Sequence, residues 1–239
     1  MSAFMTLLQW DVRLQNRNGF YGASVFVVVV VGSLLLAIPV AARTPAGIWV
    51  PALVLINLVI TTFFFVSGLI LIERDEGSLL ALAVSPLSPA AYLGARAATL
   101  TTLAVLETGA FVLLAFEAPS SWPLFICGTL TAGAIYTSIG AAMATRYASI
   151  NEFLLPATIV VTGLLVPLLP LLGLGTRFPL FWHPLEPSLV LVRASYEGGS
   201  AAQLIFGVVG SLGWIAAAFW WAQRRLDSLM RDTRATGGR

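Results

Sequence analysis

Six long runs of apolar residues, separated by short polar or charged segments, dominate the chain. Each run holds about 20 mostly apolar residues, which is the length that an α-helix needs to cross the hydrocarbon core of a membrane. The pattern therefore predicts an all-α membrane protein with six transmembrane helices. These spans lie within Asn18–Ala42, Thr44–Ile72, Ala91–Phe116, Pro123–Thr145, Phe153–Gly175 and Ala202–Gln223.

The segment before the first run, residues 1–17, has a different pattern. On a helical wheel its polar side chains gather in one sector of roughly 100°, and most of the apolar ones lie opposite. Asp11 and Gln15 interrupt the apolar face. We interpret this segment as an interfacial helix on the inner membrane surface, and we assign Trp10, Arg13 and Arg17 to it. The alternative is an ordinary positively charged flank ahead of the first span.

Composition supports the membrane assignment and excludes other classes. Of 239 residues, 58% are hydrophobic and 10% charged, and the mean hydropathy is +0.91. Every basic residue is an arginine, so the chain lacks the lysine that a P-loop ATPase requires. A net charge of +2 is too small to indicate a nucleic-acid partner. Cys127 and His183 are single residues of their kinds, and we therefore expect no bound metal or cofactor.

Arginine placement predicts the orientation of the spans. With the N-terminus inside, ten arginines lie on the inner side, and only Arg43, Arg177 and Arg193 lie outside. Both termini are then cytoplasmic, and the tail 224–239 should extend the last helix briefly before it frays. No polar segment is long enough to fold alone, so we expect residues 1–239 to form one multi-pass domain in the cell membrane.

The charged segment 73–89, between the second and third runs, looks like more than a connecting loop. Gly77 allows a turn, Ser78 is a plausible N-cap, and Pro86 would end about two helical turns. Leucines, Leu79 and Leu82 among them, would give this short helix an apolar face. We therefore predict a short cytoplasmic helix that packs on a partner or on the membrane surface, because two turns are marginal alone. The alternative is a solvated loop.

Prolines mark the fifth run and the segment 176–202 that follows it. That segment should lie outside and form one or two short helices, because its prolines prevent a long one. The fifth run itself contains Pro156, Pro167 and Pro170. These prolines suggest a bent helix that lines a transport path. The alternative is that proline is simply commoner in membrane helices than in soluble ones.

Glu107 lies inside the third run, where a charge costs about 2.5–3.5 kcal/mol on insertion scales. Asn57 in the second run could reach it from another helix. One hypothesis is that Glu107 faces the transport path and meets a cationic group on the cargo. The other is a protonated acid that is hydrogen-bonded between helices.

The segment "ERDEGSLLALAVSPLS" resembles the cytoplasmic loop of type-2 permeases of ATP-binding-cassette (ABC) transporters. That family's loop runs Glu-Arg, two variable residues, Gly-Ser/Thr-Leu and then Ser/Thr-Pro-Leu. The matching residues are Glu73, Arg74, Gly77, Ser78, Leu79, Ser85, Pro86 and Leu87. Within the family, "WDVRLQNRNGFYGA" and "INLVITTFFFVSGLILIERDEGSL" are most similar to fluoroquinolone-export permease subunits. The haem-exporter type of permease has a similar loop, but the N-terminal piece fits it poorly.

The resemblance implies a surface helix at the N-terminus, six spans, and short outer helices between spans five and six. It also implies that the loop helix docks on a separate ATPase subunit, which binds ATP and Mg, and transmits its closure. Six helices are few to enclose a path for a drug-sized molecule, so a second permease half, identical or not, should pair with this one. A drug, a lipid or a peptide would be the cargo.

Two other classes compete with this interpretation. An ion-coupled secondary transporter could carry its proton on Glu107, but six spans are few for such a carrier. An intramembrane enzyme has little support, because the chain contains neither HExxH nor GxSxG and has no second acid within its spans. We therefore predict a permease subunit that has no ATPase activity of its own.

Overall fold

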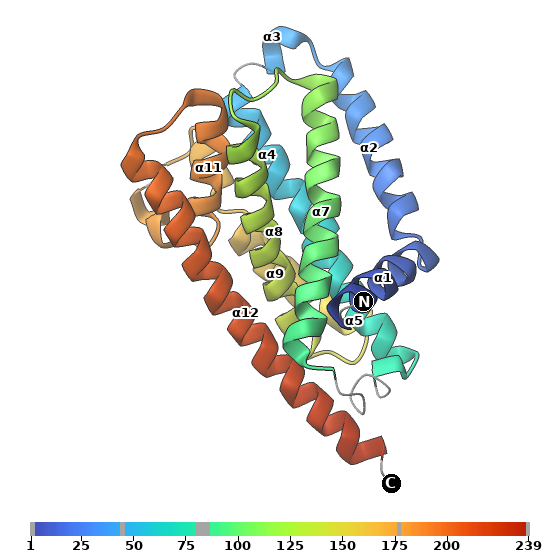
Figure 1. The fold of residues 1–239 in the computed structure, drawn as a ribbon. Coiled ribbons are helices and arrows are strands. Elements are labelled where there is room, and N and C mark those ends of the chain that lie inside the picture. The colour runs from blue at the N-terminus through green and yellow to red at the C-terminus, as the bar shows by residue number, and fades with distance from the viewer. Residues whose placement is uncertain (1–2, 44–45, 80–86, 176–177, 238–239) are drawn as a thin grey trace.

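The computed structural model describes residues 3–43, 46–79, 87–175 and 178–237, and its regular elements in these ranges are all helices (Figure 1). Five helices within the described ranges are long and apolar enough to cross a membrane. The first is α2 (Phe20–Ala37). The second is one continuous helix, which is made of α4 (Ala46–Leu58), η1 (Val59–Phe64) and α5 (Phe65–Asp75). The others are α7 (Pro89–Ala115), α8 (Trp122–Ala144) and α12 (Ala201–Gly237).

These five helices fall within or around five of the six predicted spans. α1 (Ala3–Arg17) precedes them and packs against α7 and α2, so the helix predicted for the N-terminal segment is confirmed. The four-residue helix α3 (Val40–Arg43) turns the chain between α2 and α4. Both chain ends lie towards the same end of the molecule, and α3 and α11 lie towards the other (Figure 1).

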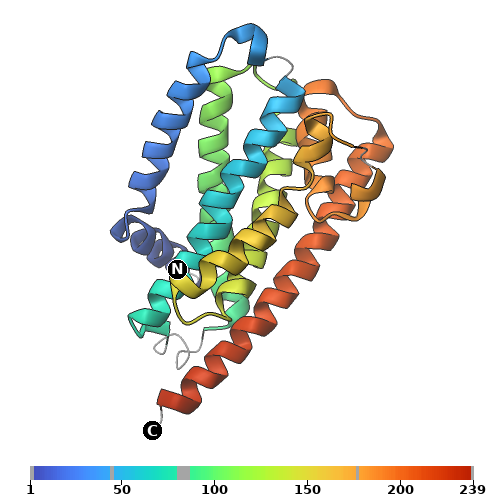
Figure 2. The same cartoon turned by 180° about the vertical axis from the view of Figure 1, so that it is seen from behind.

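The predicted fifth span is not one helix. α9 (Ile150–Leu164) has only 15 residues and crosses the back of the molecule, and a turn separates it from α10 (Leu168–Leu171) (Figure 2). The helix breaks because Pro167 has no amide hydrogen to donate to the carbonyl of Gly163, four residues earlier. Pro156, by contrast, lies inside α9.

His183 adds a side-chain contact at this break, where the Gly163 carbonyl also accepts a hydrogen bond of 3.2 Å from the amide of Val166. Its Nε2 lies 3.1 Å from the Gly163 carbonyl oxygen, and its Nδ1 accepts a hydrogen bond of 3.2 Å from the amide of Leu185. Because Nδ1 accepts, the ring is neutral and Nε2 carries the proton that it donates to Gly163. No role was predicted for His183 from the sequence, and the structure shows that it links the end of α9 to the segment before α11.

Because of this histidine, we expect the free energy of unfolding to decrease as the pH is lowered below neutrality. Burial lowers the pKa of His183 below its ordinary value of 6.5, so the folded chain binds the proton more weakly than the unfolded chain does. The contribution is therefore complete above pH 6.5 and is lost as the pH falls towards the lower pKa of the folded state. Thermal melting between pH 7.5 and 5 should show a decline that His183→Gln reduces. Equal slopes for the two proteins would contradict this role.

The segment before α12 forms two short helices, η2 (Phe178–Trp182) and α11 (Glu186–Glu197), as predicted. α11 packs into the angle between α8 and α12, where glycines allow close approach. A Cβ on Gly128 would lie 2.7 Å from Val192, and one on Gly207 would lie 2.6 Å from Leu191. α12 itself is a single helix of 37 residues, so the predicted early fraying of the tail is wrong.

α8 is the central helix, and it contacts α7, α11, α12 and η1. Its small residues face the middle of the second span and α7. A Cβ on Gly140 would lie 2.7 Å from the carbonyl oxygen of Phe63, and one on Gly133 would lie 2.6 Å from Thr101. The Ser67 hydroxyl also donates to the Gly140 carbonyl at 3.1 Å. Close backbone approach of this kind is how membrane helices gain packing contacts.

Candidate functional site

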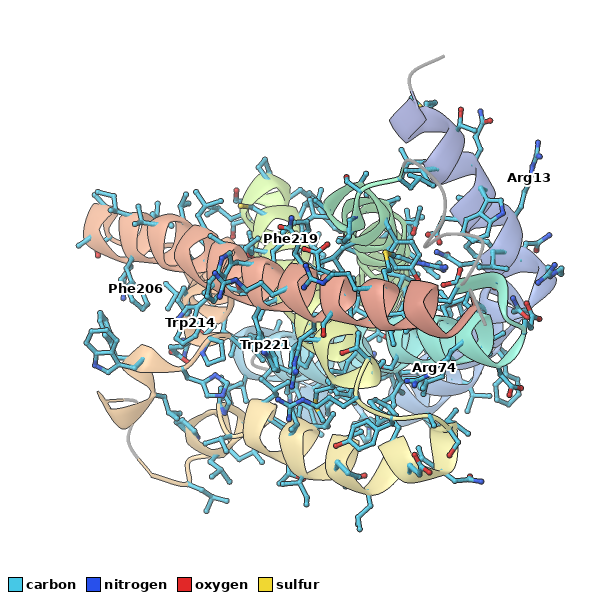
Figure 3. The ribbon with its side chains drawn as sticks, turned by 90° about the horizontal axis from the view of Figure 1, so that it is seen from below. Arg13, Arg74, Phe206, Trp214, Phe219 and Trp221 are labelled. Atoms are coloured by element: carbon cyan, nitrogen blue, oxygen red, sulfur yellow. The ribbon has the colours of Figure 1, made fainter. Side chains whose placement is uncertain are left out.

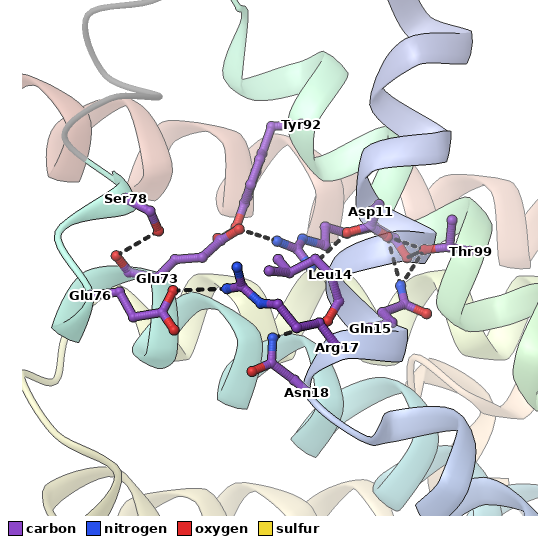
Figure 4. A network of polar contacts seen from close by, with 11 residues as sticks. Asp11, Leu14, Gln15, Arg17, Asn18, Glu73, Glu76, Ser78, Tyr92 and Thr99 are labelled. Carbon is purple, nitrogen blue, oxygen red and sulfur yellow. Dashed lines mark hydrogen bonds and ion pairs between the residues drawn. The ribbon is translucent and has the colours of Figure 1, made fainter.

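The base of the charged loop is a buried cluster of charges rather than a solvated helix end. Glu73, in the last turn of α5, is fully buried. Its carboxylate accepts hydrogen bonds from the Tyr92 hydroxyl and from Arg96 on α7 (Figure 4). The sequence places Glu73 at the start of the charged segment 73–89 and does not predict this burial. Glu73 holds the base of the loop and has no exposed carboxylate to offer another protein.

Arg96 joins three helices through its guanidinium. Nη1 lies 2.6 Å from Asp11 Oδ1 on α1, and Nη2 pairs with Glu73 on α5. The side chains of all three residues are at most 2% exposed. The rings of Tyr92 and Trp10 flank the guanidinium, with centroids 5.1 and 5.7 Å away, within range of cation–π attraction. The sequence predicts Arg96 only as one of the ten arginines of the inner side, and the structure places it at the centre of this cluster.

Asp11 and Gln15 lie on the buried side of α1, so their interpretation as faults in an apolar face was wrong. The Gln15 amide donates to Asp11 at 2.7 Å and to the Thr99 hydroxyl oxygen at 2.8 Å, and Thr99 in turn donates to Asp11. Arg13 projects away from the bundle (Figure 3), and Trp10 is 38% exposed. α1 therefore has a polar face towards α7, in addition to the polar sector predicted from the sequence.

A buried ion pair fixes the relative position of the helices that it joins more than it increases the free energy of unfolding. Its desolvation cost roughly offsets the attraction, but loss of one partner costs about 3–5 kcal/mol because a charge is left buried alone. Any movement of α1, α5 or α7 that separates these charges is therefore costly, because it would leave Asp11, Glu73 or Arg96 buried without its partner. One sequence signal could have indicated the cluster: Tyr92 and Arg96 are four residues apart, which places both on one face of α7.

Beyond Glu73 the chain turns sharply. Gly77 has a φ of +72°, which favours glycine, and the Ser78 hydroxyl donates to the Glu73 carbonyl at 3.1 Å. Leu79 is buried. The rest of the helix predicted from the sequence falls on residues 80–86, among them Leu82 and Pro86. These residues lie outside the described part of the chain.

Two further contacts hold this turn. The Arg74 guanidinium donates to the Tyr147 carbonyl at 2.8 Å, which joins the end of α5 to the turn between α8 and α9. Arg17 on α1 forms an exposed ion pair of 3.2 Å with Glu76. α1, the end of α5 and the α8–α9 turn are therefore connected around the loop.

A second polar cluster lies within the spans. Glu107 on α7 is 4% exposed, and it accepts hydrogen bonds from Asn57 Nδ2 at 3.1 Å and from the Thr61 hydroxyl. Asn57 Nδ2 also lies 3.2 Å from Thr108 Oγ1. The predicted reach of Asn57 to Glu107 is thus confirmed. Within the described part of the chain, Glu107 Oε1 and Asn57 Oδ1 are both buried without a hydrogen-bond partner.

Thr61 was not foreseen as a partner of Glu107. It lies in η1, a π-helical stretch, and π-bulges are frequent at functional sites. Of the other predicted path residues, Pro167 lies in the turn between α9 and α10, and Pro170 lies within α10, which packs against α4.

Long apolar helices that bury their charges in pairs and hydrogen-bonded clusters define a polytopic helical membrane protein. Comparison with family models adds the function class: the chain belongs to the fluoroquinolones export permease protein family, which is matched over residues 2–231. The predicted resemblance to fluoroquinolone-export permeases is confirmed.

Two curated relatives carry the same name. They are fluoroquinolones export permease proteins of Mycobacterium tuberculosis, from strain CDC 1551 / Oshkosh and strain ATCC 25618 / H37Rv. Each is 24% identical to this chain over 203 residues, which cover 84% of both chains. No solved structure matches the chain.

Proposed function

We propose that the chain is the membrane-spanning subunit of an ATP-driven ABC exporter that moves fluoroquinolones or other small amphiphilic molecules out of the cell. ATP and Mg bind to a separate ATPase subunit. A second permease half, identical or different, completes the transport path. The chain lies in the cell membrane with both termini cytoplasmic, on the side where the ATPase docks.

The buried cluster of Asp11, Glu73 and Arg96 is the observation that carries this proposal. A loop that couples an ATPase to transport must transmit the movement of the ATPase to the transmembrane helices. A loop whose base is loosely held would move without displacing those helices. Here the residue that opens the loop is paired to α7 and, through Arg96, to α1. Movement of the loop therefore requires α1, α5 and α7 to move together. Family membership and the loop motif support the same reading.

The proposal is tested by co-expression with an ABC ATPase subunit from the same organism. Gly77→Ala forces a side chain into a positive φ of +72° and should reduce both co-purification of the ATPase and drug-stimulated ATP turnover several-fold. Gly19→Ala is the matched control, because Gly19 has a φ of +77°, equally open surroundings, and a place outside the loop. Unchanged co-purification and turnover in Gly77→Ala would exclude the docking role.

An ion-coupled carrier that uses Glu107 is the second candidate, and its buried, unpartnered Oε1 is the observation in its favour. Efflux from proteoliposomes distinguishes the two. A carrier loses efflux when an uncoupler dissipates the proton gradient at constant ATP, and Glu107→Gln should abolish it. The ATP-driven exporter continues under the uncoupler. If Glu107→Gln also leaves drug resistance and expression unchanged, Glu107 has no role in the path and serves only to join α7 to the second span.

A further inference from the structure

A cavity of about 790 Å³ lies among side chains of η2, α11 and the beginning of α12. The helix α11 lies towards the end of the molecule away from α1 (Figure 1). Sites for drug-sized ligands usually enclose about 300–1,000 Å³ and combine apolar walls with a few convergent polar groups. This cavity has both kinds of lining. Its apolar part comes from η2 and α12, and its charges come from α11.

The charges form one row along α11. Glu186, Arg193 and Glu197 are spaced by seven and four residues, which puts them on one face of the helix. Arg193 Nη2 pairs with Glu186 Oε1 at 2.5 Å, and each of these two side chains is 8% exposed. Among the described lining residues, carboxylates thus outnumber guanidinium groups by two to one. A surface made only for lipid contact would not carry them.

The second carboxylate, that of Glu197, lies beside a different element. Glu197 Oε1 lies over the first turn of α4, so close that a Cβ on Gly47 would be 2.1 Å from it. The amino end of a helix carries partial positive charge, which stabilises a carboxylate there. Glu197 therefore has a favourable electrostatic neighbour other than the guanidinium of Arg193.

The apolar wall is aromatic. Phe181 on η2 stacks on Phe206 of α12, with ring centroids 4.2 Å apart and planes 19° apart. Figure 3 shows Phe206 on the side of α12 that faces η2. Trp182, beside this pair, is 81% exposed at the cavity. Aromatic faces next to excess carboxylate are the recognition chemistry of organic cations.

We propose that this cavity binds an amphiphilic organic amine, with its ring against Phe181 and Phe206 and its amine towards Glu186 and Glu197. The inference rests on the proposed export function for its relevance to cargo, but it concerns binding by this chain alone. A lipid headgroup amine offers the same cationic chemistry as a free drug, so the experiment must separate these sources. Anionic headgroups are disfavoured by the carboxylates.

The test measures equilibrium binding to the purified full chain in phosphatidylglycerol nanodiscs, which contain no lipid amine. The probes are norfloxacin, a quinolone with a basic amine, and nalidixic acid, a related ring acid without one. Norfloxacin should bind about tenfold more tightly than nalidixic acid. Each of the substitutions Glu197→Gln and Glu186→Gln should weaken the binding of norfloxacin about three- to tenfold and leave the binding of nalidixic acid unchanged. Phe206→Leu should weaken the binding of both probes.

Glu117→Gln is the matched control, because Glu117 is an exposed carboxylate at the same end of the molecule that lines a neighbouring cavity, shared with Glu197 but not with Glu186. Size-exclusion profiles and melting curves show whether each variant folds. Competition by added phosphatidylethanolamine would support amine recognition and assign the cavity to lipid. Equal norfloxacin binding by wild type, Glu186→Gln and Glu197→Gln would overturn the inference. That result would leave ATPase co-purification untouched, so the two proposals can fail separately.

Discussion

Replacement of Arg96 by methionine is expected to lower the Tm of the purified protein by about 10 °C. The substitution leaves two carboxylates, Asp11 and Glu73, facing each other in a site with at most 2% exposure. Removing one partner of a buried ion pair costs about 3–5 kcal/mol. In a chain of this size, each kcal/mol shifts the Tm by about 2–4 °C. Differential scanning fluorimetry in detergent or nanodiscs measures the shift.

A rescue variant separates charge from packing. The triple variant Asp11→Asn, Glu73→Gln, Arg96→Met keeps the shapes of the side chains and removes every buried charge, so it should recover most of the lost Tm. Arg17→Met is the control, because it removes an exposed ion pair whose side chains are 64% and 44% accessible. If Arg96→Met melts like the wild type, the three helices are not held by this cluster. If the triple variant also fails to stimulate the ATPase, position alone is not what the cluster supplies.

Gly140→Ala should produce the second large effect, a fall in Tm of about 6 °C. Its added Cβ would lie 2.7 Å from the Phe63 carbonyl oxygen and 2.9 Å from Val66, and backbone cannot step aside as a flexible side chain can. Overpacking of this kind typically costs about 1–3 kcal/mol. Separation of α8 from η1 would also break the bond from Ser67 to the Gly140 carbonyl.

Gly109→Ala provides the comparison for Gly140→Ala. A Cβ on Gly109, inside α7, would meet nothing within 4 Å, and alanine is the better helix former. Its Tm should stay the same or rise slightly. A Gly140→Ala protein that melts like Gly109→Ala would show that α8 and η1 can move apart without loss.

Hydropathy was enough to place most of the fold. Five predicted spans became long apolar helices because length and apolarity are local properties of the chain. The fifth span failed because its hydropathy says nothing about where Pro167 interrupts the helical hydrogen bonds. His183, which contacts the Gly163 carbonyl at this break, lies 20 residues further on. The length of α12 was underestimated for a different reason. Charged residues after Gln223 end a membrane span but do not end a helix.

The candidate sites show the same division between local and distant information. Glu107 and Asn57 could be paired from the sequence because polar residues inside neighbouring spans must find one another. Glu73 could be recognised as part of the loop motif, but its burial depends on Asp11 and Arg96, and Asp11 looked misplaced when α1 was considered alone. The polar face of α1 became understandable only once α7 lay against it.

The π-helical stretch η1 has a consequence for the phase of the second span. Arg96 and Glu107 are 11 residues apart on α7, about 20° around a regular helix, so their partners must approach from one direction. Asn57 and Glu73 are 16 residues apart, which would place them about 160° apart on an unbroken α-helix. The wider turn of η1 winds more slowly and reduces that angle. One helix can thereby present an amide at mid-span and a carboxylate at its end to the same neighbour, which a helix of uniform pitch could not do.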